Sequence, residues 1–494
     1  MKTFTKKAVL SLVLLVAGTR TSQAQYLDDG LRLGAPSTGV GARSLGMGTA
    51  YTSLSNDYSG MYWNPAGLGL MQTNEFSIGL SNLSYNNTGT YYGNQSNSTN
   101  SVTSLNSAGF VYNVPTSRGS LVIGLGYGRT NEFTTGLNFS GFNPSSSIIQ
   151  SWAPDGAVLT PDPTIAEYLL LAYADTLTGR FVSPIGDSLT QSGKITEGGG
   201  LNNWSFAGSV EAARNVYLGL SLNYIAGSYK FNRKYYEDDY NNIYSTARYP
   251  YDVSSVSYAE DVNTDISGFS MKFGFLANPT PGIRLGLTVK TPSWITQHET
   301  FSSVATSSFK NGDNYSYAPN NGGPSTNDYS VATPWVFSGG LSFDLWIFTV
   351  AGDIDYTDWT QLEYSSAYYY SSDFENYLNE LNQQAKDYLR PTANLRGGAE
   401  INLREIGTSL RGGFMYFPSP YQFDTNLNAQ KYLTAGLGVL FDGAVALDFA
   451  YAYGWWETSH VMYSGYDQND AYFSSSTSEK VFTHNVIATF TYRF

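Results

Sequence analysis

Cysteine is absent from the 494-residue chain. Disulfide frameworks and thiolate metal sites are therefore excluded, although an oxidising compartment stays open. Charged residues are also scarce: they make up 14% of the chain, whereas soluble domains carry about 25%. Acids predominate and give a net charge of −13 at pH 7. An acidic chain is a poor nucleic-acid binder, so we expect no nucleic-acid partner.

Long apolar runs are missing beyond the start of the chain. There, three lysines precede an apolar run over 8–17 and small residues at Ser22 and Ala24. This pattern predicts a secretory signal peptide over residues 1–24. No later run reaches the roughly eighteen apolar residues that a transmembrane helix needs. If the chain enters a membrane, it must do so as a β-barrel.

Glycine and tyrosine are abundant, with 50 and 40 copies, and many segments alternate in polarity. In 217–226, 345–356 and 444–453 one face carries large apolar residues and the other carries small or polar ones. Such alternation is typical of strands with one face on lipid and one on a lumen. Segments of this kind predict an all-β fold, a transmembrane antiparallel barrel of about 14 strands. We expect Asp353 and Asp355 to be solvated lumen charges rather than an ion site.

The connections between these segments differ in length. Short ones, such as 278–282 and 441–443, contrast with long polar insertions such as 130–200 and 360–392. Short turns on one rim and long loops on the other fit a periplasmic rim and an extracellular rim. Within the last insertion, apolar residues at helical spacing predict a helix over 374–388.

One stretch near the start, 39–72, follows neither a strand period nor a helix period. It combines glycines, among them Gly46 and Gly48, with apolar bulk, which indicates a compact insert. Because a barrel of about fourteen strands leaves a lumen, we expect residues 25–72 to plug it as a hatch. Arg43 and Asp57 are its candidate gating charges, since a buried charge needs a partner. The alternative is that each finds a lumen partner and has no gating role.

The last strand also carries a signal. Phe490, Tyr492 and Phe494 share one face, and the chain ends on an aromatic residue. Such an ending resembles the C-terminal signal by which bacterial outer-membrane barrels are recognised for insertion. We therefore expect the barrel-insertion machinery to be a partner, and outer-membrane lipids and lipopolysaccharide to surround the protein.

Several segments together resemble the FadL/TodX family of outer-membrane transporters for long-chain fatty acids and aromatic hydrocarbons. These segments are Gly-Val-Gly-Ala-Arg-Ser-Leu-Gly-Met-Gly at 39–48, Trp-Asn-Pro-Ala-Gly at 63–67, and the later segments 284–292, 333–340 and 353–359.

The resemblance implies a signal peptide at 1–24, a hatch at 25–72 that contains Asn64, Pro65 and Ala66, and a barrel with long extracellular loops at 73–494. It also implies passive uptake of hydrophobic small molecules across a bacterial outer membrane, with capture at the loops, an interior pocket and lateral release. Relatives with the same plan act in protein secretion or surface attachment, which is the alternative. The substrate-binding residues stay unknown.

Catalytic and metal-binding patterns are not found. His298, His460 and His484 are far apart and show no ligand spacing. No nucleophile elbow, phosphate loop or dinucleotide motif is present, and so few histidines argue against a hydrolase. We expect a monomeric protein that is not an enzyme and has no metal and no cofactor.

Overall fold

The computed structural model describes residues 27–152, 164–175, 180–246, 249–367, 372–466 and 472–494. The predicted signal peptide, 1–24, lies outside these ranges. None of the helices within them is long and apolar enough to cross a membrane.

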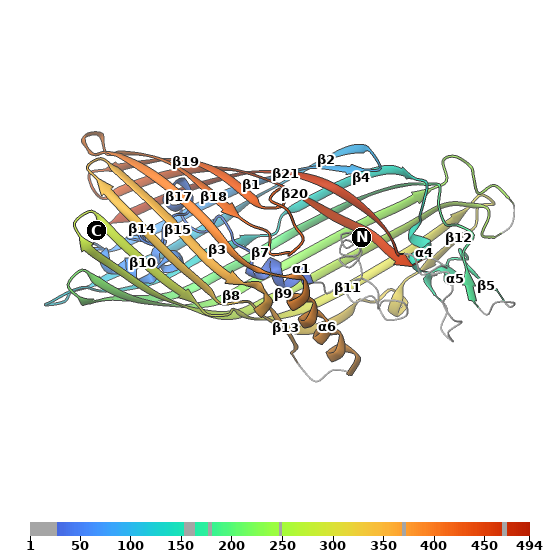
Figure 1. Cartoon of the computed structure of the whole chain (residues 1–494), viewed down its shortest axis with the longest axis horizontal. Coiled ribbons are helices and arrows are strands. Elements are labelled where there is room, and N and C mark those ends of the chain that lie inside the picture. Colours follow the sequence, from blue (N-terminus) through green and yellow to red (C-terminus); the bar gives the residue numbers. More distant parts are fainter. Residues whose placement is uncertain (1–26, 153–163, 176–179, 247–248, 368–371, 467–471) are drawn as a thin grey trace, which may run out of the picture.

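The chain forms a closed antiparallel barrel (Figure 1). Its strands are β1 (Glu75–Tyr91), β2 (Asn94–Val114), β3 (Leu121–Glu132), β4 (Thr135–Asn143), β7 (Leu189–Ala213), β8 (Val216–Asp238), β9 (Val253–Thr280), β10 (Ile283–Lys290), β11 (Trp294–Phe309), β12 (Asn314–Tyr317), β13 (Ser325–Ala332), β14 (Val336–Leu345), β15 (Phe348–Asp358), β16 (Glu363–Ser366), β17 (Pro391–Leu403), β18 (Thr408–Phe417), β19 (Gln430–Phe441), β20 (Val445–Tyr466) and β21 (Tyr472–Arg493). Two short strands, β5 (Tyr173–Asp175) and β6 (Arg180–Val182), pair apart from the barrel.

Some strands that follow each other in the chain lie end to end along one line of the wall. We call each such line, or each single strand that forms a line by itself, a stave. The compound staves are β3–β4, β10–β11, β12–β13–β14 and β15–β16. The wall therefore has 14 staves, which confirms the predicted number and class. β1 pairs with both β2 and β21, so no barrel edge is left open at this point.

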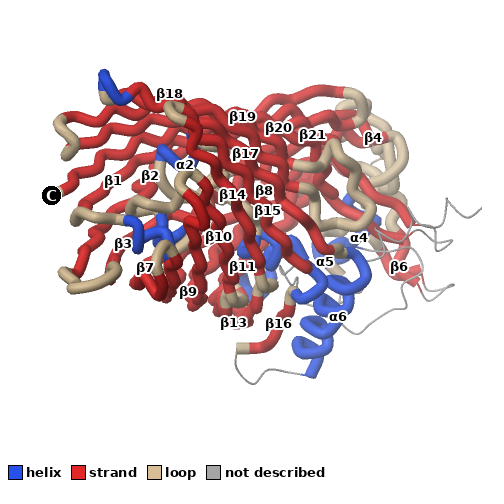
Figure 2. The backbone as a smooth tube through the Cα atoms, turned by 60° about the vertical axis from the view of Figure 1, so that its left-hand side comes forward, coloured by secondary structure: helices blue, strands red, loops and turns tan. Residues whose placement is uncertain are grey.

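Most helices lie inside the barrel or at its long-loop rim, and η5 lies in the short turn between β17 and β18 at the other rim (Figure 2). They are α1 (Leu27–Gly34), α2 (Ala42–Gly46), α3 (Gly60–Trp63), η2 (Pro65–Leu70), α4 (Ile148–Trp152), α5 (Ile165–Tyr168), η3 (Pro319–Gly322), η4 (Trp359–Gln361), α6 (Ser372–Tyr388) and η5 (Arg404–Ile406).

The polarity alternation of the strands appears in the structure as an apolar outer surface. On β8, Leu218 and Tyr224 are 46% and 54% exposed, while Ser221 and Asn223 face the lumen and are buried. Exposed large apolar residues recur on nearly every stave. An outer wall of this kind is stable only against lipid, because water would leave its apolar area unsatisfied.

The segment 345–356 is predicted correctly except at its start. Trp346 lies in the turn between β14 and β15, with φ +58° and 88% exposure, so the strand begins at Phe348. The wall is also taller than the membrane requires. β9 has 28 residues, whereas crossing takes about 9–11. Parts of the predicted insertion 130–200 therefore belong to β4 and β7 instead of loops.

The helix predicted over 374–388 is confirmed as α6, whose apolar side is buried. α6 lies in the connection between β16 and β17, and β17, β18 and β19 are short, with 13, 10 and 12 residues. It packs on β16 and on α1, in one apolar cluster that includes Leu31 and Leu378. In Figure 1, α6 stands beside this part of the barrel.

Candidate functional site in the barrel lumen

Residues 27–72 lie within the lumen and contact the inner face of the wall. Their glycines explain how the two backbones come so close. A Cβ on Gly48 would lie 2.5 Å from the carbonyl oxygen of Gly397, and one on Gly46 would lie 3.2 Å from Cα of Gly436. Gly48 also has φ +58°, a conformation that favours glycine. Both predicted glycines therefore sit at direct contacts with β17 and β19.

The Asn-Pro-Ala triplet begins a helical turn on the side of the lumen opposite β17 and β19. The Asn64 side chain accepts a hydrogen bond from the backbone N–H of Ala66 at 3.1 Å, so it caps η2, and Pro65 occupies the first position of that turn. The Asn64 Nδ2 group donates to the carbonyls of Thr52 and Phe275 at 2.8 and 3.1 Å. The triplet is thus a cap that also fastens the segment to β9.

Two wall carboxylates accept hydrogen bonds from backbone N–H groups of the lumen segment. Asp353 of β15 accepts from Tyr51 and Thr52 at 2.8 and 2.7 Å. Glu75 of β1 accepts from Tyr58 at 2.8 Å. Asp353 is 6% exposed, so the prediction of a solvated lumen charge is wrong for this residue. Backbone donors and an ion pair to the wall compensate its burial.

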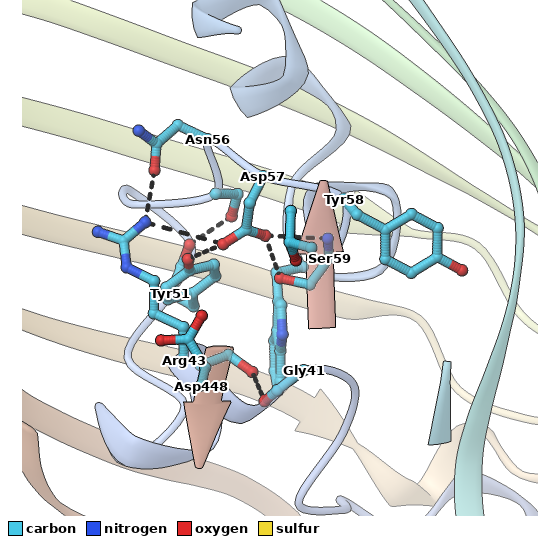
Figure 3. A network of polar contacts seen from close by, with 12 residues as sticks. Gly41, Arg43, Tyr51, Asn56, Asp57, Tyr58, Ser59 and Asp448 are labelled. Atoms are coloured by element: carbon cyan, nitrogen blue, oxygen red, sulfur yellow. Dashed lines mark hydrogen bonds and ion pairs between the residues drawn. The ribbon is translucent and has the colours of Figure 1, made fainter. Parts of the chain in front are cut away.

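Arg43 and Asp57 belong to one polar network (Figure 3). The two side chains approach to 3.7 Å. Arg43 also donates to Asn56 at 2.9 Å, and its Nε lies 3.3 Å from the carboxylate of Glu400 on β17. Tyr51 donates its hydroxyl hydrogen to Asp57. The structure therefore brings the two predicted charges together, but the closer acidic partner of Arg43 is in the wall.

The charge states in this network are well defined. Burial alone lowers the pKa of Arg43, but the carboxylates of Glu400 and Asp57 outweigh it, and the pKa is raised well above its ordinary value. Burial also raises the pKa of the Tyr51 hydroxyl well above its ordinary value. Arg43 therefore keeps its charge, and Tyr51 keeps the proton that it donates to Asp57.

Sequence reasoning missed the wall side of this network. Glu400 also binds Arg411 of β18 at 2.6 Å, and Arg411 in turn binds Asp448 of β20 at 2.5 Å. These residues occupy the polar face of predicted strands, so the alternation predicts that their side chains point into the lumen. Alternation does not predict their partners, because Arg43 and Glu400 are 357 positions apart.

A cavity of about 250 Å³ remains between the lumen segment and the wall. One side is aromatic, with Tyr85 of β1, Tyr432 of β19 and Trp456 of β20. The ring centroids of Tyr85 and Tyr432 lie 6.1 and 6.3 Å from that of Trp456. The other side is polar and is formed by α1, β3, β4 and β7, where Arg32 and Glu197 line the cavity.

The cavity lies beside a seam in the wall. The ladder between β2 and β3 joins Val114 to Leu121 at one end and Ser107 to Gly128 at the other, and it stops there. Further along, β2 pairs with β1, and β4 pairs with β7. Side chains bridge this part of the seam instead, as where Asn100 Nδ2 donates to the Thr135 carbonyl at 2.6 Å.

The stave next to the seam is itself interrupted. β3 ends at Glu132 and β4 begins at Thr135. Facing this gap, β7 carries the run 198–200 of three glycines, and Gly199 has φ +103°. The wall is therefore thin and weakly paired where the cavity reaches it, since both Thr135 and residues of β2 line that cavity.

The insertion-signal residues and two of the three histidines lie away from the lumen. Phe490, Tyr492 and Phe494 are exposed on the outer face of the last strand, 39%, 44% and 55% respectively. His298 contacts Asp328 at 2.5 Å, and His484 contacts Tyr451 at 2.7 Å. Within the described ranges, no group of three or more His, Cys, Asp or Glu residues could hold a metal ion.

No protein-family model and no curated protein matches the chain. Solved structures do match. The Pseudomonas putida toluene transporter TodX aligns with a TM-score of 0.53 at 13% identity, over 92% of this chain and 99% of that chain. A Pseudomonas aeruginosa FadL homologue aligns with a TM-score of 0.53 at 13% identity, over 91% and 98%. At this identity the likeness establishes the fold: the chain has the β-barrel architecture of FadL/TodX-type transporters.

Proposed function

We propose that the protein takes up hydrophobic small molecules, of the fatty-acid or aromatic-hydrocarbon class, passively across the outer membrane. The observation that carries the proposal is the cavity of about 250 Å³, which lies beside an unpaired seam of the wall. A partly aromatic lining favours apolar solutes, and a seam next to it offers a sideways exit into lipid. The names of the structural neighbours agree with transport of this kind.

In this proposal residues 25–72 act as the hatch, and Arg43 and Asp57 are its gating charges. The contacts of Gly46, Gly48 and Asn64 with the wall support a seated plug. Because the fastenings are a limited set of ion pairs and hydrogen bonds, they can be exchanged for others without unfolding the barrel.

Capture at the outer loops is the first step of the proposed route. Large apolar side chains are exposed on the loops of the long-loop rim, including Tyr168 at 49%, Tyr240 at 76% and Ile243 at 50%. Such residues offer weak binding to hydrophobic molecules that approach from outside.

Release follows through the seam between β2 and the β3–β4 stave. Opening this seam breaks few backbone hydrogen bonds, because side chains such as Asn100 bridge most of it. An apolar solute then passes from the cavity into the hydrocarbon layer without crossing the periplasmic rim.

The transport proposal is tested by uptake of labelled oleate and labelled toluene into cells that make the protein and into cells that do not. We expect faster uptake of at least one compound with the protein. Equal uptake of both compounds by the two strains contradicts the proposal.

The release route is tested with a disulfide across the seam, in the double variant Asn100→Cys and Thr135→Cys. The natural chain has no cysteine, so no other thiol can form a disulfide with the introduced pair. Oxidation should abolish uptake and reduction should restore it. The matched control is Ser459→Cys with Ser478→Cys, two exposed cross-strand neighbours on β20 and β21. If the seam disulfide forms and uptake continues, the exit lies elsewhere.

The alternative, a barrel component of a secretion or surface-attachment system, gains no support from the lumen. A pull-down from detergent extracts separates the two, because that role requires a stoichiometric protein partner.

A further inference from the structure

From the charges on the outer face of the wall we infer a binding site for the acidic core sugars of a lipopolysaccharide. Its centre is the pair formed by Lys194 of β7 and Lys234 of β8. The site lies on the outside of the barrel and requires no transported molecule, so it goes beyond the proposed function. Its two lysines lie above the lipid, are opposite each other, and have no acid at their paired positions.

The two lysines lie beyond the apolar band of the wall. Trp204 and Tyr224 are cross-strand neighbours, 56% and 54% exposed, and mark the end of this band toward the long-loop rim. Lys194 and Lys234 are each ten residues further along their strands. At about 3.3 Å per residue and a strand tilt of about 40°, ten residues rise about 25 Å. The headgroup layer of a phospholipid is only about 5–7 Å thick, so the lysines reach the height of the sugars that a lipopolysaccharide carries on its lipid.

Lys194 and Lys234 are directly opposite each other in the ladder between β7 and β8. Both residues are exposed, and in the described part of the chain neither forms an ion pair within 4.0 Å. Side chains at directly opposite positions have Cβ atoms about 4.5–5.5 Å apart, and like charges there repel each other. A phosphate or carboxylate between the two ammonium groups replaces this repulsion by two attractions.

Lys480 shows the usual arrangement of an exposed lysine on this barrel. It is directly opposite Glu457 in the ladder between β20 and β21, and the two charged groups are 3.8 Å apart. The protein itself therefore supplies the anion for Lys480. For the lysine pair on β7 and β8, an anion from outside the chain takes the place that Glu457 has beside Lys480.

The acids nearest to the pair do not neutralise it. Among the described positions opposite or diagonal to the two lysines, the sole acid is Asp261 of β9, and it accepts a hydrogen bond from Asn232 at 2.5 Å. Lys230 lies on the same face, diagonal to Asp261 and Asp265. The three lysines and two aspartates give this face a formal charge of 3 − 2 = +1. The whole chain carries −13, so an anion is attracted here and repelled by the protein as a whole.

A lipopolysaccharide fits this face better than a free anion does. The pair is exposed, and salt weakens its attraction for any ion in solution. A lipopolysaccharide is already held beside the wall by its lipid, so its acidic groups meet the lysines at a high effective concentration. Its sugars also carry hydroxyl groups, which can donate hydrogen bonds to side-chain oxygens such as those of Asn138 and Asn232, the neighbours of the pair.

The test measures the affinity of the full chain, purified in detergent, for a lipopolysaccharide that retains its core sugars. We expect Lys194→Gln with Lys234→Gln to weaken binding at least tenfold, while heat-modifiable migration shows that the barrel is folded. Lys194→Arg with Lys234→Arg keeps both charges and should bind within about threefold of the natural protein. Unchanged affinity in the folded glutamine variant overturns the site.

Lys480→Gln is the matched control, because it removes one exposed lysine from the same outer wall. We expect its affinity to stay within about twofold of that of the natural protein. A loss as large as that of the double variant would show a general effect of net charge, and it overturns the site as well. Neither result bears on the proposed uptake, which is measured separately.

Two further ligands identify the source of the anion. Lipid A has no core sugars, and we expect it to bind at least tenfold more weakly and to lose little affinity in the double variant. Inorganic phosphate should not compete with the lipopolysaccharide. Lipid A that binds as tightly as the complete molecule overturns the assignment to the core sugars. Inorganic phosphate that binds as tightly overturns the assignment to a lipopolysaccharide.

Discussion

Arg43 joins the lumen segment to the wall through Glu400, and its own segment through Asn56 and Asp57. A charge in this position stabilises only one arrangement of the segment, because Glu400 keeps Arg411 when Arg43 moves away. The network can therefore hold the lumen segment, and its release would leave no wall carboxylate without a cation.

Replacement of Arg43 by Gln should loosen the seated segment. Loss of one member of a buried pair costs about 3–5 kcal/mol, and we expect the lower part of that range because Arg43 is partly exposed. The readout is maleimide labelling of a Ser44→Cys reporter, which is fully buried in the seated state. Labelling should accelerate at least tenfold. Arg118→Gln, on an exposed turn, is the matched control, and an equal rate in both variants contradicts the prediction.

Gly398 shows how a side chain can be excluded by backbone proximity. A Cβ at this position would lie 2.1 Å from the carbonyl oxygen of Met47, whereas at Gly397 the nearest atom is the Ala351 oxygen, at 3.9 Å. Gly398→Val should push the lumen segment away from β17 and make cells sensitive to large antibiotics such as vancomycin. Gly397→Val should not. Equal sensitivity of the two strains would falsify the close approach.

At the scale of elements, α6 and α1 pack against each other in one apolar cluster. α6 follows from sequence because its apolar residues recur at helical spacing, and this property is local. Its place against α1 does not follow, because α1 is about 350 residues earlier in the chain. The helix period shows which side is buried and leaves open what buries it.

Leu378→Asp should detach α6 from the barrel, because it places a carboxylate in the apolar cluster that α6 shares with α1. Limited trypsin digestion should then cut after Lys386 at least tenfold faster. Asn379→Asp introduces the same group on the exposed side and should digest like the natural protein. If both variants digest alike, α6 is not held by this cluster.

At the scale of the whole molecule, the barrel wall and the lumen segment are structurally separate parts. The wall is one closed sheet, and the lumen segment adds no strand to it. A barrel of fourteen staves encloses more space than inward side chains fill. We therefore expect the segment 39–72 to decide whether the barrel conducts ions.

Deletion of residues 40–70 should leave a folded but open barrel. In planar bilayers we expect large, steady conductance, where the full chain shows little. Far-ultraviolet circular dichroism and heat-modifiable migration check that the barrel persists. A folded deletion variant that shows no increase in conductance would mean that other residues close the lumen.

The fold was predictable because alternation is a local property. The pleat places successive side chains on opposite faces, so rows such as Leu218, Leu220 and Tyr224 show a strand and its lipid face without any knowledge of neighbours. The same reasoning failed at Trp346, where a turn residue continued the alternation by coincidence. It also failed at Asp353, because a polar residue on the lumen face was assumed to meet water.

By itself the sequence determined the barrel class, the approximate number of strands, the helix in the long loop and the irregular stretch that contains the Asn-Pro-Ala triplet. Only the tertiary structure decided that Arg43 meets Glu400, that the β2–β3 ladder ends at Ser107, and that Arg32 and Glu197 share one cavity. The physical reason is the distance along the chain over which each property is determined. Periodicity is set by bonds between neighbouring residues, whereas charge pairing and ladder length are set by residues that folding brings together from distant parts of the chain.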